Sequence, residues 1–432
     1  MRSTAGSLIF VVIMLLVDWY VFMAVKTVSH NASPKTKTII FTIFWIVSAI
    51  SVLFIALLPY IHYESWQRPF RTYIFAVVIG LFLAKLMSVF FFLIDDIRRA
   101  LQWLSSKFFF KNTGVETISE EGISRSTFLS WLGLGIGTTL FGTLLYGFRN
   151  QYNYQVKKVQ LAFDNLPNAF RGLKIIHISD IHSGSFMDKK AVQLGVDLIN
   201  KQGADMILFT GDLVNDRASE MEDYTDVFNK LKAPMGVFST LGNHDYADYV
   251  AWADRDNTHK QKERAAGTRL LTPMQQKNLD DLKNIHATMG WRLLVDEHVI
   301  LEKGEDKIAL IGVQNISGKI RFHSYGDMAK AHTGSELHTF KILMSHDPSH
   351  WDKEVKSKYP DVDLMLSGHT HGMQFGLQLP WFKWSPVQFV YRQWHGLYED
   401  GKQKLYVNPG FGFIGYPGRV GILPEVTVIE LV

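Results

Sequence analysis

Four long apolar runs occupy the first 150 residues of this 432-residue chain. They extend from Leu8 to Val25, Thr38 to Ile61, Tyr73 to Ile94 and Phe128 to Phe148. A helix needs about 20 apolar residues to cross a hydrocarbon core of about 30 Å, and each run is long enough. A buried helix of a water-soluble protein could explain one such run, but four in succession argue against it. We therefore predict a multi-pass membrane protein whose residues 1–150 form four transmembrane helices, with the lipid bilayer as a partner.

Two charged residues lie inside these apolar runs, Asp18 in the first and Lys85 in the third. Charges within a membrane are costly, so they mark either a function or mutual neutralisation. An ion pair between the two residues, or a lysine that reaches to the interface, is the simpler interpretation. A transporter or sensor role for the four helices stays as an alternative.

The distribution of positive charge favours one orientation in the membrane. With the N-terminus outside, the cytoplasmic loops would be residues 26–37 and 95–127, which hold slightly more lysine and arginine than the opposite side. In addition, the segment from Ser124 to Gly137 resembles a twin-arginine export signal in which Ser126 replaces the second arginine. Both features favour an arrangement with the C-terminal half outside the cytoplasm.

The sequence changes character after residue 150, and we predict an α/β domain over residues 151–432. Short apolar strands alternate with amphipathic segments, such as Lys189 to Lys201. Several strands are apolar at every position, which predicts burial on both faces. The strands run into polar residues, as in KIIHISD and DMILFTGD. In such sheets, functional groups gather at the C-terminal ends of the strands.

The polar groups at these strand ends form a set suited to binding metal ions. In chain order they are Asp180, His182, Asp212, Asn243, His244, Asp245, His346, His369 and His371. In an extended strand, residues i and i+2 point to the same side, which predicts that Asp180 and His182 grip one ion together. Glycines beside several of these residues allow the backbone to approach a ligand closely. The chain has no cysteine, and oxygen with imidazole suits Mn²⁺, Fe, Zn²⁺, Ni²⁺ or Mg²⁺.

The set is large enough for two divalent metal ions, for which Mn²⁺ is our first candidate. A carboxylate such as Asp212 can bridge two ions about 3.5–4 Å apart, and a water between them is acidified to hydroxide near neutral pH. Hydroxide is a nucleophile suited to in-line attack on phosphorus, and the ions would neutralise charge on the phosphoryl oxygens. An imidazole that is not a ligand would protonate the leaving oxygen.

The motif order D-x-H, G-D, G-N-H-D, H and G-H-x-H resembles the calcineurin-like metallophosphoesterases, over about residues 170–432. The resemblance implies a metal-dependent phosphoric ester hydrolase and an α/β fold, a two-sheet β-sandwich flanked by helices. By position, the implied ligands are Asp180, His182 and His371 for the first ion, Asn243, His346 and His369 for the second, and Asp212 as the bridge. The resemblance also implies that His244 contacts phosphate and donates a proton, and that Asp245 orients His244.

The C-terminal segment YVNPGFGFIGYPGRVG resembles the branch of membrane-associated bacterial phosphodiesterases and UDP-diacylglucosamine pyrophosphatases. It implies hydrolysis of a phosphodiester or pyrophosphate bond in a phosphorylated small molecule or a lipid-linked substrate. That branch often has glycine where this chain has Met373, which could reshape the rim of the pocket. Arg419 is a candidate substrate contact, because a guanidinium group matches phosphate geometry. The formal net charge of +4 gives no case for a nucleic-acid partner.

Three alternatives stay open at this point. The aromatic segment from Phe375 to Trp394 could pack in the core or lie against the bilayer. The basic insertion from Tyr246 to about Lys283 could be a solvated flap or a lid over an anionic substrate. Finally, the domain could be a non-catalytic metal- or phosphate-binding sensor or scaffold coupled to the membrane helices, although no expected ligand is missing.

Overall fold

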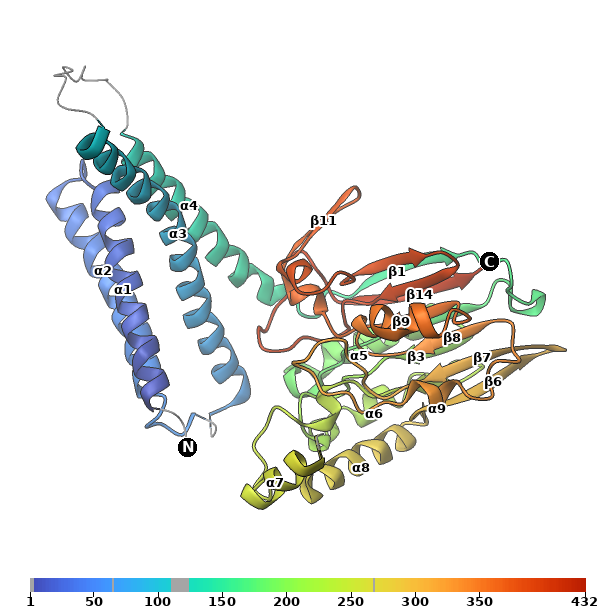
Figure 1. Ribbon diagram of the computed structural model, residues 1–432. Coiled ribbons are helices and arrows are strands. Elements are labelled where there is room, and N and C mark those ends of the chain that lie inside the picture. The colour runs from blue at the N-terminus through green and yellow to red at the C-terminus, as the bar shows by residue number, and fades with distance from the viewer. Residues whose placement is uncertain (1–3, 64–65, 110–123, 267–268) are drawn as a thin grey trace. The chain divides into compact units, whose positions relative to one another are not determined.

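The structure is a computed structural model that describes residues 4–63, 66–109, 124–266 and 269–432. The chain divides into two compact units, Met1–Tyr146 and Gly147–Val432. We term them the membrane unit and the α/β unit and describe each by itself (Figure 1).

The membrane unit consists of long helices that match the predicted spans. They are α1 (Thr4–Val28), α2 (Pro34–Leu57), α3 (Arg68–Phe109) and α4 (Arg125–Gly147). All four are long and apolar enough to cross a membrane, which confirms the predicted transmembrane helices. Helix α3 has 42 residues, so at about 1.5 Å per residue it is longer than a hydrocarbon core requires.

Asp18 and Lys85 form a buried ion pair inside the membrane unit. The Lys85 Nζ atom lies 2.6 Å from Asp18 Oδ1 and donates a second hydrogen bond to the Ser48 hydroxyl at 2.8 Å. Asp18 is only 2% exposed. The ion-pair interpretation is confirmed, and the pair links α1, α2 and α3.

Lys85→Met is expected to destabilise the membrane unit by roughly 3–5 kcal/mol, because it leaves the Asp18 carboxylate buried without a cation. The double variant Asp18→Asn, Lys85→Met removes both charges and is expected to keep most of the stability. Thermal unfolding in detergent, followed by the circular dichroism of the helices, measures both effects. Equal losses in the single and the double variant would contradict a stabilising pair.

Two six-stranded sheets form the centre of the α/β unit. The first has the order β1 (Gln155–Leu161), β14 (Glu425–Leu431), β2 (Lys174–Ile178), β3 (Met206–Phe209), β4 (Val237–Ser239), β5 (Arg292–Leu293). The second has the order β12 (Gly396–Asp400), β13 (Gln403–Val407), β9 (Leu364–Ser367), β8 (Lys341–Met344), β7 (Asp306–Gly312), β6 (Glu297–Lys303). The helices are α5 (Lys189–Asn200), α6 (Thr225–Phe228), α7 (Asn257–Ala266), α8 (Pro273–Thr288), α9 (Met328–His332) and α10 (Lys356–Lys358).

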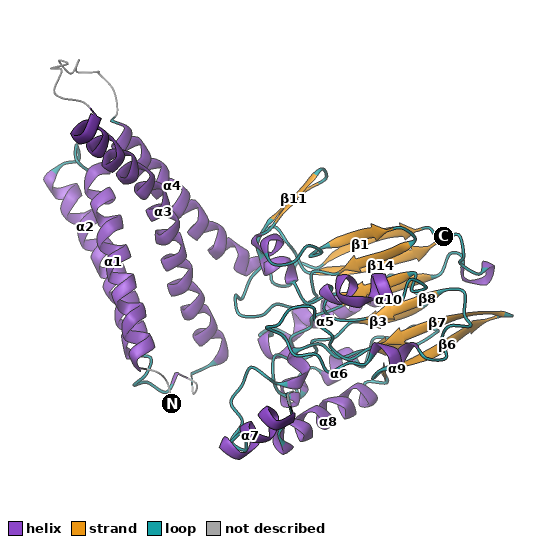
Figure 2. Cartoon of the chain, in the orientation of Figure 1, coloured by secondary structure: helices purple, strands orange, loops and turns teal. Residues whose placement is uncertain are grey.

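The two sheets pack face to face, and helices cover their outer faces (Figure 2). Ile175 of β2 packs in one buried cluster with Leu310 and Ile342 of the second sheet. The next residue, Ile176, points to the other face and packs with Val192 of α5. On the far side, β7, β8 and β9 pack against α9. Strand β3 is apolar at every position and is buried on both faces, as predicted for several strands. This layered sandwich confirms the predicted fold class.

Candidate metal centre

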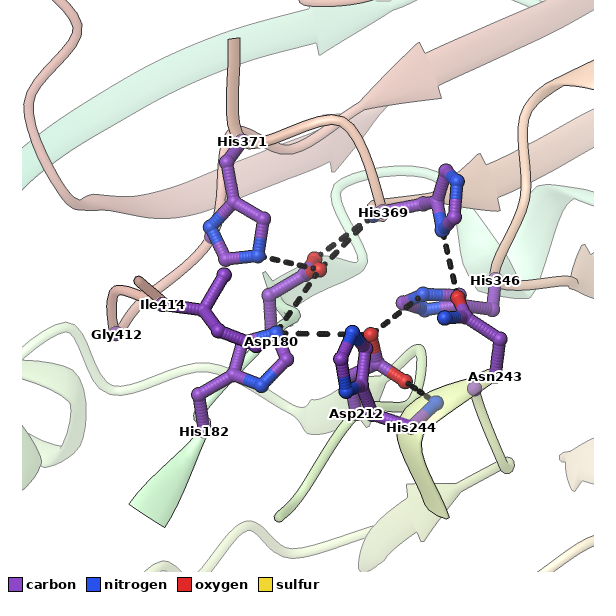
Figure 3. Close-up of polar contacts among 12 residues, drawn as sticks. Asp180, His182, Asp212, Asn243, His244, His346, His369, His371, Gly412 and Ile414 are labelled. Carbon is purple, nitrogen blue, oxygen red and sulfur yellow. Dashed lines mark hydrogen bonds and ion pairs between the residues drawn. The ribbon is translucent and has the colours of Figure 1, made fainter. Parts of the chain in front are cut away.

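The topology brings the C-terminal ends of several strands to one edge of the sandwich. Strands β2, β3 and β4 are parallel neighbours in the first sheet, as are β8 and β9 in the second. The segments that follow these strands contain all the residues predicted from the sequence as metal ligands or as their partners. These residues converge, as Figure 3 shows.

A first group of buried side chains consists of Asp180, His182 and His371, whose ligand atoms all lie within 4.8 Å of one another. The His371 Nε2 and Asp180 Oδ1 atoms are 3.1 Å apart. These are the three residues that the resemblance assigned to the first ion, and the structure places them together.

A second group consists of Asp212, His346 and His369. The His346 Nε2 atom lies 3.0 Å from Asp212 Oδ2. Asn243, an amide that belongs to the predicted set, places its Oδ1 atom 2.7 Å from His369 Nδ1. The residues predicted for the second ion therefore also lie side by side.

Asp212 joins the two groups. Its Oδ2 atom lies 3.0 Å from His346 Nε2 in the second group and 3.6 Å from His182 Nε2 in the first. In Figure 3 the Asp212 carboxylate lies between the side chains of the two groups. A carboxylate that bridges two cations needs this position.

Left-handed backbone conformations direct most of these side chains. Positive φ angles occur at Asp180 (54°), His182 (49°), Asp212 (61°), His369 (71°) and His371 (51°). Each such non-glycine residue costs of order 1–3 kcal/mol, and such strain concentrates at functional sites. Our expectation that strand alternation aligns Asp180 with His182 is wrong, because β2 ends at Ile178 and turns set the directions of both residues.

Two glycines leave the space that the carboxylates occupy. A Cβ atom at Gly368 would lie 2.1 Å from Asp180 Oδ2, and one at Gly242 would lie 2.2 Å from Asp212 Oδ1. Distances below 3.0 Å are incompatible with a side chain at either position. The predicted close approach of backbone to the site is therefore confirmed at both glycines.

The donor set fits divalent cations. Buried polar groups are normally hydrogen-bonded, but neither ring nitrogen of His182 has a hydrogen-bond partner among the described residues. Carboxylate oxygens of Asp180 and Asp212 lie 3.9 Å and 3.6 Å from its Nε2 atom. A buried imidazole with free lone-pair capacity between two carboxylates is the environment of a metal ligand.

Outer partners orient two further imidazoles. The Nδ1–H of His346 donates to the Thr210 carbonyl at 2.8 Å, which leaves Nε2 for the site. The Nε2 atom of His369 lies 2.7 Å from the Tyr391 hydroxyl, which leaves Nδ1 beside Asn243. Metal-binding histidines typically have such partners. Neither partner could be predicted from the sequence, since one is a backbone carbonyl and the other lies 22 residues after His369.

The electrostatics of the site favour ionised carboxylates and mostly neutral imidazoles. Burial opposes ionisation of Asp180, but His371 and His346 hold its pKa well below the ordinary value. Asp212 behaves in the same way beside His346 and His244, with a lowered pKa. Burial lowers the pKa of His182 and of His369. These protonation states are the ones that metal binding requires.

His346 differs from the other imidazoles. Burial opposes its protonation, but the Asp212 and Asp180 carboxylates raise its pKa to about 10. The buried Asp180 and Asp212 carboxylates thus stabilise a positive charge at this point of the site. A divalent cation would supply that charge in place of the proton.

His244 belongs to neither ligand group but lines the same cavity. Its backbone N–H donates to Asp212 Oδ1 at 2.8 Å. Its Nδ1 atom lies 2.7 Å from the Asn215 carbonyl, so that carbonyl orients the ring. The Nε2 atom therefore stays available for a ligand in the cavity.

Asp245 has a different role from the one the resemblance implied. Its carboxylate accepts hydrogen bonds from the backbone N–H groups of Gly242 (2.8 Å), Asp212 (2.9 Å) and Leu213 (2.9 Å). Asp245 therefore fixes the loop that carries Asp212, while the Asn215 carbonyl orients His244.

Arg419 is completely buried, at 0% exposure. Its guanidinium donates to the carbonyl oxygens of Pro409, at 2.8 Å, and of Gly412. The Nη2 atom lies 3.4 Å from His371 Nδ1. This placement, behind the first ligand group, differs from the phosphate contact that we predict from the sequence.

A cavity of about 590 Å³ opens above both ligand groups. Its floor contains His182, Asp212, Asn243, His244, His369 and His371. Its remaining wall is mostly apolar and is formed by Ile320, Phe322, Met373, Val387, Val390 and Ile414, together with Lys319, Arg321 and Tyr391. Met373 thus lies at the cavity, as predicted for a residue that shapes its rim.

The basic insertion does not contribute its described arginines to this cavity. Arg255 pairs with Glu263, and Arg269 donates to Asp248 at 3.0 Å. Both guanidinium groups are therefore bound by carboxylates of the insertion itself. The side chains of Lys260 and Arg264 lie outside the described residues.

Two family models match the chain. The model described as "Probable Calcineurin-like phosphoesterase, transmembrane domain" matches residues 1–151. The model described as "Calcineurin-like phosphoesterase" matches residues 173–373, which contain both ligand groups. The chain belongs to the calcineurin-like phosphoesterases.

Relatives of this calcineurin-like phosphoesterase include a transmembrane protein with metallophosphoesterase domain from Danio rerio. It is 29% identical over 283 residues, which are 64% of this chain and 57% of the relative. An uncharacterized metallophosphoesterase of Campylobacter jejuni is 28% identical over 280 residues, 64% of this chain and 63% of the relative. The matches thus span less than two thirds of these relatives.

Solved structures with a similar arrangement include a 5'-nucleotidase precursor from Thermus thermophilus. The identity is 12%, the TM-score is 0.35, and the match covers 60% of this chain and 54% of that one. The NAD nucleotidase of Haemophilus influenzae gives 16% identity and a TM-score of 0.33, with 54% of this chain and 44% of that one covered.

Proposed function

We propose that this calcineurin-like phosphoesterase is a membrane-anchored hydrolase that cleaves a phosphodiester or pyrophosphate bond with the help of two divalent metal ions. The observation that carries the proposal is the position of Asp212, whose Oδ2 atom approaches both ligand groups. One carboxylate shared by two adjacent groups of O and N donors is the arrangement of a two-metal hydrolase.

The proposed ligands are Asp180, His182 and His371 for one ion, Asn243, His346 and His369 for the other, and Asp212 for both. When bound, the two ions would lower the pKa of water in the site and neutralise charge on the phosphoryl oxygens. The surrounding residues hold these ligands in place. The Asp245 side chain holds the Asp212 loop, and the Thr210 carbonyl and the Tyr391 hydroxyl orient two imidazoles.

His244 is the proposed general acid. Its Nδ1 atom is held by the Asn215 carbonyl, so Nε2 is the atom that can donate a proton to the leaving oxygen. The apolar wall of the cavity suits a substrate with an apolar part, which supports a lipid-linked phosphodiester or pyrophosphate over a wholly polar one. The narrower likeness to UDP-diacylglucosamine pyrophosphatases stays a prediction.

We also propose that the site lies on the extracytoplasmic side of a bacterial inner membrane, as the charge distribution of the loops favours. A reporter fused after Val432 and tested for periplasmic or cytoplasmic activity decides between the two sides.

The proposed function is tested by purifying the full chain in detergent, removing metal with a chelator, and adding back Mn²⁺, Fe²⁺, Zn²⁺, Ni²⁺ or Mg²⁺ one at a time. We expect hydrolysis of bis(4-nitrophenyl) phosphate to disappear on chelation and to return most strongly with Mn²⁺. The Asp18→Asn, Lys85→Met double variant is expected to hydrolyse it normally. Full activity after rigorous chelation would refute the proposal, and tight metal binding without hydrolysis of any phosphodiester or pyrophosphate would favour the sensor alternative.

A further inference from the structure

A small hairpin leaves the α/β unit directly after the metal-binding segment. Strands β10 (Leu377–Leu379) and β11 (Phe382–Trp384) pair only with each other among the described strands. Their register places Leu377 opposite Trp384 and Leu379 opposite Phe382. Directly opposed residues share a face of an antiparallel pair, so these four side chains form one apolar face. Figure 1 shows the hairpin projecting from the rest of the α/β unit.

The apolar side chains of this region are exposed to an unusual extent. Trp381, in the turn of the hairpin, is 81% exposed, and Phe389 in the following segment is 80% exposed. By contrast, Trp394 is 3% exposed and packs with Tyr391 and Ile422. The end of the aromatic segment therefore packs in the core, whereas its beginning forms an exposed surface. An isolated two-stranded hairpin is marginally stable in water, and large exposed apolar patches mark interaction sites.

Further exposed apolar residues lie at the cavity or next to it in the chain. Phe389 precedes Val390, which is 55% exposed and lines the cavity together with the fully exposed Ile320. We term Ile320, Leu377, Leu379, Trp381, Phe382, Phe389 and Val390 the hairpin surface.

Positive charge accompanies the hairpin surface. Lys319 and Arg321 flank Ile320 and line the cavity, and Arg392 is exposed two residues after Val390. The only acidic side chain that lines the cavity, among the described residues, is Asp212 at its floor. Aromatic side chains mixed with lysine and arginine are typical of surfaces that bind at the boundary of headgroups and acyl chains. Anionic lipids attract such cations over about one Debye length.

The chain itself tethers the α/β unit to a membrane span. Helix α4 ends at Gly147, the residue at which the α/β unit begins, so no flexible linker separates that unit from a membrane span. A short tether raises the effective concentration of the bilayer, so that even a modest apolar surface would be occupied.

We propose that the hairpin surface inserts into the interface of a bilayer that contains anionic phospholipid, and that the cavity therefore opens at the level of the headgroups. Trp381 and Phe389 enter the apolar boundary, while Lys319, Arg321 and Arg392 lie among the phosphates. The docking itself does not depend on the proposed function. The docking has one consequence that rests on the proposed function: a lipid-borne phosphoester would reach the metal centre without leaving the membrane.

The chain has no cysteine of its own, so a single introduced cysteine can be spin-labelled selectively. Docking can therefore be measured without any activity assay. Leu379→Cys introduces a single thiol on the apolar face of the hairpin, and it leaves Trp381 and Phe389 in place. Leu337→Cys is the control, since Leu337 is 90% exposed and precedes β8, at the opposite ends of the strands from the metal centre. Each full-length variant is spin-labelled, reconstituted into vesicles with or without phosphatidylglycerol, and probed with oxygen and a water-soluble nickel chelate.

We expect the label at position 379 to collide mainly with oxygen and the label at position 337 mainly with the nickel chelate. Removing phosphatidylglycerol is expected to raise the exposure of position 379 to the nickel chelate. If that exposure did not change with lipid charge, the proposed role of the cations would be overturned. Equal exposure of both positions to nickel would overturn the docking. Spin–spin broadening at position 379 in detergent would also overturn it, because the surface would then bind a second copy of the chain.

An activity measurement tests the consequence for the substrate. The variant Trp381→Ser, Phe389→Ser changes residues outside the cavity wall, so hydrolysis of a soluble phosphodiester is expected to stay unchanged. Hydrolysis of a phosphodiester carried by a lipid in vesicles is expected to fall about tenfold, since two large apolar side chains no longer anchor the unit. If the variant and the wild type hydrolysed the lipid-borne substrate at equal rates, the consequence for the substrate would be overturned. A wild type inactive on both substrates would refute the proposed function but would not affect the spin-label result.

Discussion

Asp212→Asn is expected to abolish metal-dependent hydrolysis and to remove most of the bound metal. The Asp212 Oδ2 atom approaches an imidazole of each ligand group, so both proposed ions lose a charged ligand at once. Loss of the bridging carboxylate is expected to reduce transition-state stabilisation by several kcal/mol, which lowers the rate by roughly 10³–10⁴-fold. Metal content by mass spectrometry and the rate on a soluble phosphodiester measure the two effects in the same preparation.

Asparagine is the informative replacement because it preserves the local fold. Asp212 has a φ of 61°, a conformation that asparagine tolerates better than most residues. The amide oxygen can still accept the hydrogen bond from the His244 backbone N–H. Loss of activity would then reflect the missing charge and not a collapsed loop.

Asp363→Asn is the matched control. Asp363 is also a buried carboxylate, and it accepts hydrogen bonds from the Lys341 N–H and the Asn165 side chain, both at 2.8 Å. It precedes β9, at the end of the strand opposite the metal centre. We expect this variant to lose some thermal stability but to keep its metal and at least half of its activity. If both variants kept metal and activity, Asp212 would not be a bridging ligand.

Two kinds of sequence information predicted the fold and the candidate site: local apolar runs and the order of the motifs along the chain. The four spans and the buried strands followed from apolar runs, which are local signals. The convergence of Asp180 and His371, which follow strands of different sheets, was predicted from the motif order and from the tendency of functional groups to gather at the C-terminal ends of strands. Neither the spans and strands nor the convergence of these residues required knowledge of a particular side-chain contact.

What the sequence did not reveal depends on backbone conformation and on atoms without a sequence signature. Strand alternation gave a plausible reason for the pairing of Asp180 with His182, but left-handed turns at both residues are the actual cause. The partners of Asp245 are backbone N–H groups, and that of His346 is a backbone carbonyl. Such partners appear only when the loops are folded. The arginine at position 419 illustrates the same limit, because its burial against carbonyl oxygens cannot be distinguished from phosphate binding in a sequence.

His244→Ala is expected to lower the hydrolysis rate by 10²–10⁴-fold, the usual contribution of a general acid, while the metal content stays unchanged. The metal should remain because His244 belongs to neither ligand group. The loss should also depend on the leaving group. A nitrophenolate leaves without a proton, so its release should suffer less than the release of an alkoxide, which needs the proton that His244 Nε2 would supply.

The leaving-group dependence distinguishes proton donation from a purely structural role. His323→Ala is the control, since His323 is an exposed histidine whose loss should leave the rate on both kinds of ester unchanged. An equal loss on both esters in His244→Ala would mean that His244 only contacts the phosphate. A loss of metal would mean that the His244 ring, through its contact with the Asn215 carbonyl, positions the loop whose backbone N–H binds the Asp212 carboxylate.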